Sequence, residues 1–414
     1  MSLFLHPSLP LPAPLRAAEV PSFTHYSVVT RLPDIARRTL AENHFSQPVA
    51  TAIQALIDEI PAGKIRPIQD PLAPDLAAWE GWARPYLGMD YLEAPWFFVE
   101  EYFYRRILEA TGYFAGGEGH LRDPYAHQKA LGLQSSRDAI RRLAEHAAQA
   151  ERSGSGDTPE ELERLLLADL WGNQNDLSLW PVQAEGGQYA GGTAGGGLQA
   201  AQERILANDL PHLLAWFDQQ GAGARVDILL DNAGYELVTD LALADHLLTH
   251  RRAGQVTLHA KSYPVFVSDA IEADVFDALD ALYFNPDPRV KDLSARLRAA
   301  LLDGTLAIRR HLAWNSPLPM WEIPADLAEA VGAADLLIAK GDANYRRLLG
   351  DRHWDTRLPF PRVVDYLPCA VLALRTLKSE IAVGIDPARA PATDPDWMTD
   401  GQWGLVQFAG KNRL

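Results

Sequence analysis

The second half of the chain alternates short apolar runs with stretches of helical periodicity, and this alternation constrains the fold more than any other feature of the sequence. Such an alternation is typical of a parallel sheet whose strands are joined by crossover helices. We therefore predict an α/β domain over residues 223–414. Its predicted strands are Val226–Leu230, Val256–His259, Val265–Val267, Leu306–Ile308 and Leu336–Ile338.

The part of the chain before this alternation is helical in pattern. Apolar residues recur at spacings of three and four in Asp34–Leu56, Trp96–Thr111 and Pro159–Leu170, as on the buried face of a helix. Thr158 is expected to cap the last of these helices, because proline follows it and an acidic residue stands three positions on. We predict a mainly α-helical domain over residues 1–183, followed by a glycine-rich loop and a connecting helix over residues 184–222.

Composition limits the possible partners. A chain of 414 residues with 47% hydrophobic residues can bury a large core, and its length suggests two domains. A net charge of -16 disfavours nucleic acid and anionic membranes as partners, whereas a small anion could still bind beside a metal cation. Cys369 is the only cysteine, which fits a reducing cytoplasm. No signal peptide or membrane span is expected, and the sequence leaves the oligomeric state open.

Polar residues follow two of the predicted strands. Asp231 and Asn232 come after the first strand, and Asp269 comes after the third. Because ligands of open α/β sheets bind beyond the carboxyl ends of the strands, these side chains are expected to share one crevice. Carboxylate and amide oxygens suit a hard cation and the phosphate that it bridges. The same residues are also common helix caps, so both interpretations stay open. Lys261 lies in the second segment and could contact phosphate.

A third cluster follows the predicted strand Leu336–Ile338. It brings Lys340, Asp342, Asn344 and Arg346 into seven residues. Arginine binds oxyanions through two parallel N–H groups, and Asp and Asn accept hydrogen bonds from hydroxyls, so a sugar phosphate would find suitable partners here. The alternative is a capped helix that carries exposed charges. Further along the chain, Arg375 and Lys378 could add positive charge to the same crevice.

Several of these segments resemble the successive signatures of the damage-control phosphatases, a family also known as domain of unknown function 89. The matching group is subfamily III, which carries an RTxK motif. The segments are LWGNQNDLSL (170–179), LLDNAGYELVTDLALADHLL (229–248), HAKSYPVFVSDA (259–270), AKGDANYRRLLGD (339–351) and RTLK (375–378).

The resemblance implies a helical domain packed on a Rossmann-like α/β/α domain with a mostly parallel sheet. It also implies a divalent metal (Mg, Mn, Co or Ni) held by Asp231, Asn232 and Asp269, which would be the catalytic residues. The implied activity is hydrolysis of small phosphorylated metabolites, with sugar phosphates such as fructose 1-phosphate as substrates. The predicted substrate contacts are Asp342, Asn344, Tyr345, Arg346, Lys378, Lys261, Asn173 and Glu100.

Two rival functions remain at this stage. One is a protein carboxyl methyltransferase that uses S-adenosylmethionine, although the glycine-rich segment 185–197 lacks the strand, glycine loop and helix that cradle a nucleotide. The other is a non-catalytic module that binds sugar phosphates. Such a module would tolerate the loss of Asp231 and Asp269, so the presence of both aspartates favours the enzyme.

Overall fold

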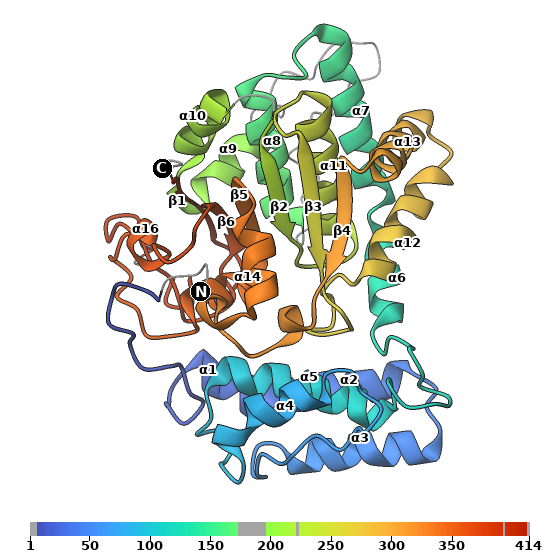
Figure 1. Ribbon diagram of the computed structural model, residues 1–414, viewed down its shortest axis with the longest axis vertical. Helices are drawn as coiled ribbons and strands as arrows, with labels where there is room; N and C mark the ends of the chain where they lie inside the picture. The colour runs from blue at the N-terminus through green and yellow to red at the C-terminus, as the bar shows by residue number, and fades with distance from the viewer. Residues whose placement is uncertain (1–5, 173–195, 221–222, 392–393, 412–414) are drawn as a thin grey trace.

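Seven strands form the sheet at the centre of the α/β unit (Figure 1). The structure is a computed structural model that describes residues 6–172, 196–220, 223–391 and 394–411. The strand order is β1-β7-β6-β5-β2-β3-β4. The strands are β1 (Ile205–Asn208), β2 (Arg225–Leu229), β3 (Gln255–Ala260), β4 (Leu306–Arg310), β5 (Leu336–Lys340), β6 (Ala370–Thr376) and β7 (Gly404–Ala409).

Most of the sheet is parallel. Each of the pairs β4·β3, β3·β2, β2·β5 and β5·β6 is parallel, whereas β7 runs antiparallel to β6 and carries β1 parallel to itself at the edge. The predicted class, a mostly parallel α/β sheet with helices around it, is thus confirmed. Parallel strands place their carboxyl ends on the same edge of the sheet, and the site is built there.

Helices cover both faces of the sheet. Alternate residues of the strands, such as Val226, Ile228 and Leu258, belong to one apolar core shared with the first group of helices. This group comprises α7 (Arg137–Ser153), α8 (Pro159–Leu170), α10 (Leu210–Gln220), α11 (Tyr235–Thr249), α12 (Glu272–Tyr283) and α13 (Pro288–Asp303). The remaining helices near the sheet are α9 (Gly196–Glu203), α14 (Ala325–Gly332), α15 (Gly341–Leu349), α16 (Phe360–Val363) and the 3-10 turns Leu312–Asn315 and Met320–Glu322.

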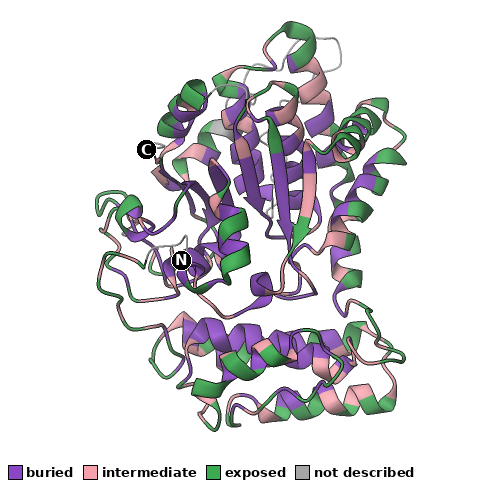
Figure 2. Ribbon diagram, in the orientation of Figure 1, coloured by how far each residue is buried: buried purple, intermediate pink, exposed green. Residues whose placement is uncertain are grey.

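The N-terminal helices form a separate layer beside the α/β unit, at the bottom of Figure 1. They share a second apolar core with strand residues such as Leu337 and Ala339. Figure 2 shows that α5 is buried along most of its length, which places it between the layer and the α/β unit. The layer contains α1 (Phe23–Tyr26), the π-helical turn Ser27–Arg31, α2 (Leu32–Glu42), α3 (Gln47–Glu59), α4 (Leu76–Ala83), the 3-10 turn Arg84–Tyr86 and α5 (Trp96–Thr111), and α6 (Ala126–Ser135) leads out of it.

Two of the predicted helices have the predicted bounds. They are α5 and α8, and the Thr158 hydroxyl accepts a hydrogen bond from the Glu161 N–H at 3.3 Å, which confirms the predicted cap. The periodic segment Asp34–Leu56 is instead divided between α2 and α3, because the backbone is extended at Asn43 and a proline stands in the first turn of α3. The predicted domain boundary at 183 falls outside the described residues.

The predicted strand Val265–Val267 is wrong. Phe266 and Val267 have positive φ angles of 50° and 68°, and the segment forms a turn. The left-handed region is unfavourable for bulky and β-branched residues, so an apolar run gives no warning of it. Among the described residues, no helix combines the length and the apolar character that a membrane span requires.

Candidate functional site

Backbone pairing brings together the segments that follow β2 and β3. The N–H of Ala233 donates to the carbonyl oxygen of Ser268, and the N–H of Ala270 donates to that of Asp231, both at 2.7 Å. Asn232 and Asp269 thereby face each other as an isolated β-bridge. The structure therefore unites Asp231, Asn232 and Asp269, the three predicted metal ligands, and leaves them 7%, 8% and 2% exposed.

Gly341 allows the first turn of α15 to reach this group. Its φ is +76°, and a Cβ atom at this position would lie 1.9 Å from Oδ2 of Asp231. Only glycine permits both the backbone conformation and the close approach. The first N–H groups of a helix have no partners within the helix and favour anions, so the start of α15 offers donors beside Asp231.

Negative charge accumulates at this point. Burial raises the pKa of Asp231 well above its usual range, and the carboxylates of Glu236 and Asp269 raise it further, while Lys378 and Lys261 oppose this. Burial also raises the pKa of Asp269 to about 6, although Lys261 lowers it. The Lys261 ammonium lies 3.3 Å from Oδ2 of Asp269. The lysines therefore neutralise these carboxyl groups only in part, and a divalent cation would supply the remaining positive charge.

The donor set has a mixed composition. Within the described ranges, no group of three or more His, Cys, Asp and Glu side chains is arranged to hold a metal ion. The predicted set differs in kind, because one of its three members is the amide of Asn232. Hard cations such as Mg²⁺ usually keep several waters and take only one or two carboxylates from the protein. Two buried carboxyl groups and an amide fit such a cation.

A buried network that the sequence analysis missed supports Asn232. The Asn232 amide donates to Oδ2 of Asp231 at 2.6 Å and to Oε2 of Glu236 at 2.8 Å, and its oxygen accepts from the Ser268 hydroxyl. The Lys340 ammonium lies 3.5 Å from Oε1 of Glu236. It also donates to Asp169 at 2.7 Å and to Asp240 at 3.0 Å.

One signal in the sequence could have revealed part of this network. Glu236 and Asp240 stand four residues apart in α11, and acidic residues at that spacing share one face of a helix. Asp169 gives no such signal, because it is 171 residues away from Lys340 in the chain.

The two predicted lysines, Lys261 and Lys378, both lie at the site but differ in burial and in their hydrogen-bond partners. Lys261 is 2% exposed, pairs with Asp269 and donates to the carbonyl oxygen of Trp314 at 3.0 Å. Lys378 is partly exposed, and its ammonium makes no hydrogen bond or ion pair with any residue that the structure describes. It is close enough to lower the pKa of Asp231. Lys378 is therefore the cation best placed to receive an anionic ligand.

The predicted substrate residues on α15 are engaged by the protein. The Asp342 carboxylate accepts from Nε of Arg375 at 2.8 Å and from the Ser379 hydroxyl at 2.9 Å. The Asn344 amide donates to the carbonyl oxygens of Leu230 at 3.0 Å and Lys340 at 2.8 Å. Tyr345 donates through its hydroxyl to Gln407 at 2.9 Å. In the structure, these contacts hold α15 against the sheet.

Glu100 and Arg346 pair with each other and connect α5 to α15. Arg346 also donates to Asp351 at 2.8 Å, and its guanidinium lies 3.7 Å from the centre of the Trp96 ring. Glu100 is fully buried and accepts a second bond from Arg31 at 2.9 Å. Asn173, the remaining predicted contact, lies outside the described residues.

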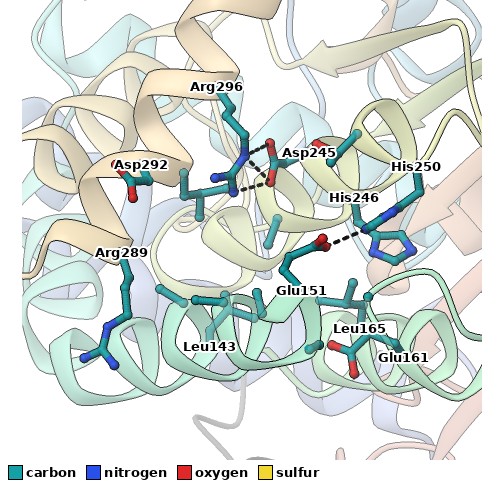
Figure 3. A pocket seen from close by; sticks show the side chains of 18 residues that line it. Leu143, Glu151, Glu161, Leu165, Asp245, His246, His250, Arg289, Asp292 and Arg296 are labelled. Carbon is teal, nitrogen blue, oxygen red and sulfur yellow. Dashed lines mark hydrogen bonds and ion pairs between the residues drawn. The ribbon is translucent and has the colours of Figure 1, made fainter. Parts of the chain in front are cut away.

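Another cavity lies away from these residues (Figure 3). It measures about 290 Å³ and is enclosed by α7, α8, α11 and α13. The rings of His246 and His250 lie 4.5 Å apart in its wall, and His250 pairs with Glu151 at 2.9 Å. It contains none of the predicted site residues, so the strand ends remain the candidate site.

The sheet, the buried carboxyl groups at its strand ends and the adjacent helix start are together typical of α/β enzymes. The family described as damage-control phosphatase ARMT1-like domain matches residues 27–391. The chain belongs to this family, and the family assignment makes it a phosphatase of metabolite repair.

Similar proteins support the assignment. The chain is 35% identical to the damage-control phosphatase ARMT1 of Mus musculus over 77% of its own length and 74% of the relative. It is 29% identical to the ARMT1 protein of Homo sapiens over 97% of its own length and 99% of the relative. A crystal structure of a DUF89 family protein from Pyrococcus horikoshii shares the fold, with a TM-score of 0.50, 15% identity, and coverage of 92% and 97% of the two chains.

Proposed function

We propose that the protein hydrolyses phosphate monoesters of small metabolites, fructose 1-phosphate among them, with a divalent cation (Mg, Mn, Co or Ni). Asp231 and Asp269 would bind the cation through carboxylate oxygens, and Asn232 through its amide. The observation that carries the proposal is the pairing of the segments after β2 and β3, which gathers these side chains beside the start of α15. The match to the damage-control phosphatase family supports the phosphatase activity.

Different residues of the chain would have different roles in hydrolysis. The first N–H groups of α15 and the ammonium of Lys378 would bind the oxygens of the scissile phosphate. A bound cation supplies charge neutralisation for the phosphate oxygens and for the leaving alkoxide. Glu236, held by Lys340, fixes the orientation of Asn232 through its hydrogen bond.

Two attacking groups are compatible with the arrangement. A water molecule could lose its proton to Asp231 or Asp269, or Asp231 could attack phosphorus directly and form an aspartyl-phosphate. Borohydride reduction of acid-quenched enzyme distinguishes them. Attack by Asp231 leaves an acyl phosphate that borohydride reduces to homoserine at position 231, whereas direct attack of water leaves Asp231 unchanged.

The proposal is tested by phosphate release from a panel of sugar phosphates. Protein stripped with EDTA should be silent, and addition of Mn²⁺, Co²⁺, Ni²⁺ or Mg²⁺ should restore release. Silence with every metal would reject the proposed phosphatase. Transfer of a labelled methyl group from S-adenosylmethionine in the same preparation would then favour the methyltransferase, and sugar-phosphate binding without turnover would favour the binding module.

The cellular setting belongs to the same proposal. A strongly acidic chain with one cysteine fits a cytoplasmic enzyme that acts on small phosphorylated metabolites. Such a net charge would repel nucleic acid and anionic membranes.

A further inference from the structure

A cavity of about 450 Å³ lies between the helical layer and the turn that precedes Asp269. Its polar lining includes Arg31, Asp34, Arg38, Tyr104, Gln128 and Ser268. This volume is typical of cavities that hold small molecules. Ser268 connects the cavity to the site, because its hydroxyl donates to the oxygen of Asn232.

Two arginines give this cavity its positive charge. The side chain of Arg31 is 40% exposed, and among the described residues its guanidinium donates only through Nη1, to Glu100 and to Ser27. A guanidinium has five N–H groups, so most of the donors of Arg31 remain available. Arg38 is 53% exposed, and its Nε lies 3.8 Å from the carboxylate of Glu42.

Glu100 holds Arg31 in place from behind. Its carboxylate is shared between Arg31 and Arg346, and it is fully buried. Glu100, which the sequence predicted as a substrate contact, is therefore not exposed to a ligand. Of Glu100 and Arg31, only Arg31 lines the cavity. A planar group fixed by such a contact loses little freedom when it binds a further anion.

The wall nearest the site is a strained turn. Phe266 and Val267 both adopt positive φ, and the Phe266 ring packs 6.3 Å from that of Phe97 and 5.1 Å from that of Tyr104. The Tyr104 hydroxyl is buried and has no hydrogen-bond partner in the described part of the chain. Strain of this kind is found mainly where the surrounding structure has a binding task.

We propose that this cavity receives the part of the substrate that carries the scissile phosphate group, namely the sugar or other organic moiety. Arg31 and Arg38 select substrates in which this moiety bears a second anionic group. That group is a carboxylate or a second phosphate. This inference rests on the proposed function and deepens it. A phosphate bound at the start of α15 would leave the rest of a sugar phosphate to extend past Ser268 toward the two arginines.

Matched substrates test the selection. We would measure kcat/KM for fructose 1,6-bisphosphate against fructose 1-phosphate, and for 6-phosphogluconate against glucose 6-phosphate. Hydrogen bonds to charged groups contribute enough for about 10- to 100-fold discrimination. The substrate with two anions should be preferred by at least about tenfold in one pair, chiefly through KM. The first pair reports on a second phosphate and the second pair on a carboxylate.

Variants assign the preference to the cavity. Arg31→Gln and Arg38→Gln should each lower the preference several-fold, while activity on the single-anion substrates is kept, and Arg31→Lys should retain part of it. Arg357→Gln removes the same charge from an arginine that is 70% exposed and absent from the cavity, so its preference should equal that of the wild type. Because Arg31 has a buried partner, Arg38→Gln serves as the variant that leaves buried contacts intact.

Equal kcat/KM within both pairs, or a preference that survives both substitutions, would overturn the inference. If no substrate is hydrolysed with any metal, the proposed function fails by itself. Calorimetric binding of 6-phosphogluconate and fructose 1,6-bisphosphate then tests the cavity alone. Weakening by about tenfold or more in Arg38→Gln, with no change in Arg357→Gln, would support it, and equal binding by all proteins would reject it.

Discussion

The Arg106–Glu59 pair of the helical layer and the carboxyl groups at the strand ends differ in how their buried charge is neutralised. On α5, Arg106 donates two parallel bonds to Glu59, at 2.9 and 2.8 Å. Although burial raises the pKa of Glu59, the bonds from Arg106 and Tyr91 lower it below its usual range. At the strand ends, lysines face a larger number of carboxyl groups, and the pKa values of Asp231 and Asp240 are raised well above their usual range.

The difference separates structural from functional charge. A carboxylate that accepts two bonds from one arginine needs nothing further and can hold helices together. A buried carboxyl group that is short of positive charge is unfavourable unless something else completes it. The Arg106–Glu59 pair is complete as it stands, whereas the carboxyl groups at the strand ends fit the proposed cation and phosphate.

The largest expected effect is the loss of catalysis when one of the buried aspartates at the strand ends is replaced. Asp231→Ala or Asp269→Ala should lower metal-dependent phosphate release by about a thousandfold, because each removes a ligand and a stabilising charge at the reacting centre. Binding of Mn²⁺, followed as a rise in Tm, should be lost as well. Glu59→Gln in the helical layer is the control and should keep the metal response. Full metal-dependent activity in a folded Asp231→Ala protein would remove Asp231 from the site.

The next effect concerns stability. Lys340 is 1% exposed and faces three acidic side chains, those of Asp169, Glu236 and Asp240. Lys340→Met removes their shared counter-charge and should lower the free energy of unfolding by about 3–5 kcal/mol, as for other broken buried pairs. Urea unfolding at pH 7.5 measures this. The double variant Lys340→Met, Asp240→Asn should recover part of the loss, and a neutral result for Lys340→Met would show that the charges are not coupled.

His246 is a buried group that stays neutral, in contrast to the charged pairs above. Burial, assisted by His250 and Arg252, lowers the pKa of His246 to about 3 from its ordinary 6.5. Below pH 6.5, His246 binds a proton in the unfolded chain but stays neutral in the folded protein. This histidine therefore reduces the free energy of unfolding as the pH falls from 6.5 toward 3. Between pH 7 and pH 5 the wild type should lose about 2 kcal/mol more than His246→Gln. Parallel unfolding curves at both pH values check this, and equal losses would contradict the low pKa.

The smallest effect is expected for Lys378, whose ammonium has no partner among the described residues. Lys378→Ala should raise KM for sugar phosphates by about tenfold, since a charged hydrogen bond to the ligand is lost while no contact of the ammonium with a described residue is broken. Lys378→Arg should restore part of the affinity. Steady-state kinetics measure both. Unchanged kinetics in Lys378→Ala would take this residue out of the phosphate site.

Much of the fold was readable because its elements are periodic. The strands β2, β3, β4 and β5 and the helices α5 and α8 follow simple apolar patterns, and parallel topology then forces the strand ends together. The pattern could not show that Phe266 and Val267 leave the strand conformation, because hydrophobicity does not determine the sign of the backbone φ angle. No strand was predicted over Ala370–Thr376 or Gly404–Ala409, where β6 and the antiparallel β7 lie.

The candidate site was readable only in part. Asp231 and Asn232 were predicted at the end of a strand, and Asp269 after a segment that is a turn rather than the predicted strand. The structure nevertheless brings the three together. Their role as metal ligands stays a prediction. The partners of Glu100 and Arg346 could not be foreseen, because the two residues are 246 positions apart in the chain. Long-range ion pairs of this kind decide which polar residues are exposed to a ligand and which are not.

The position of β7 has a consequence for synthesis of the protein. β1 joins the sheet only through β7, and their pairing connects Ile205 with Gly404. A chain that emerges from the ribosome therefore carries β1 as an unpaired strand until about 200 further residues have been made. At typical elongation rates this delay lasts about 10 to 40 seconds. During that interval chaperones can bind the unpaired segment, and the edge of the sheet is completed only once β7 has been made.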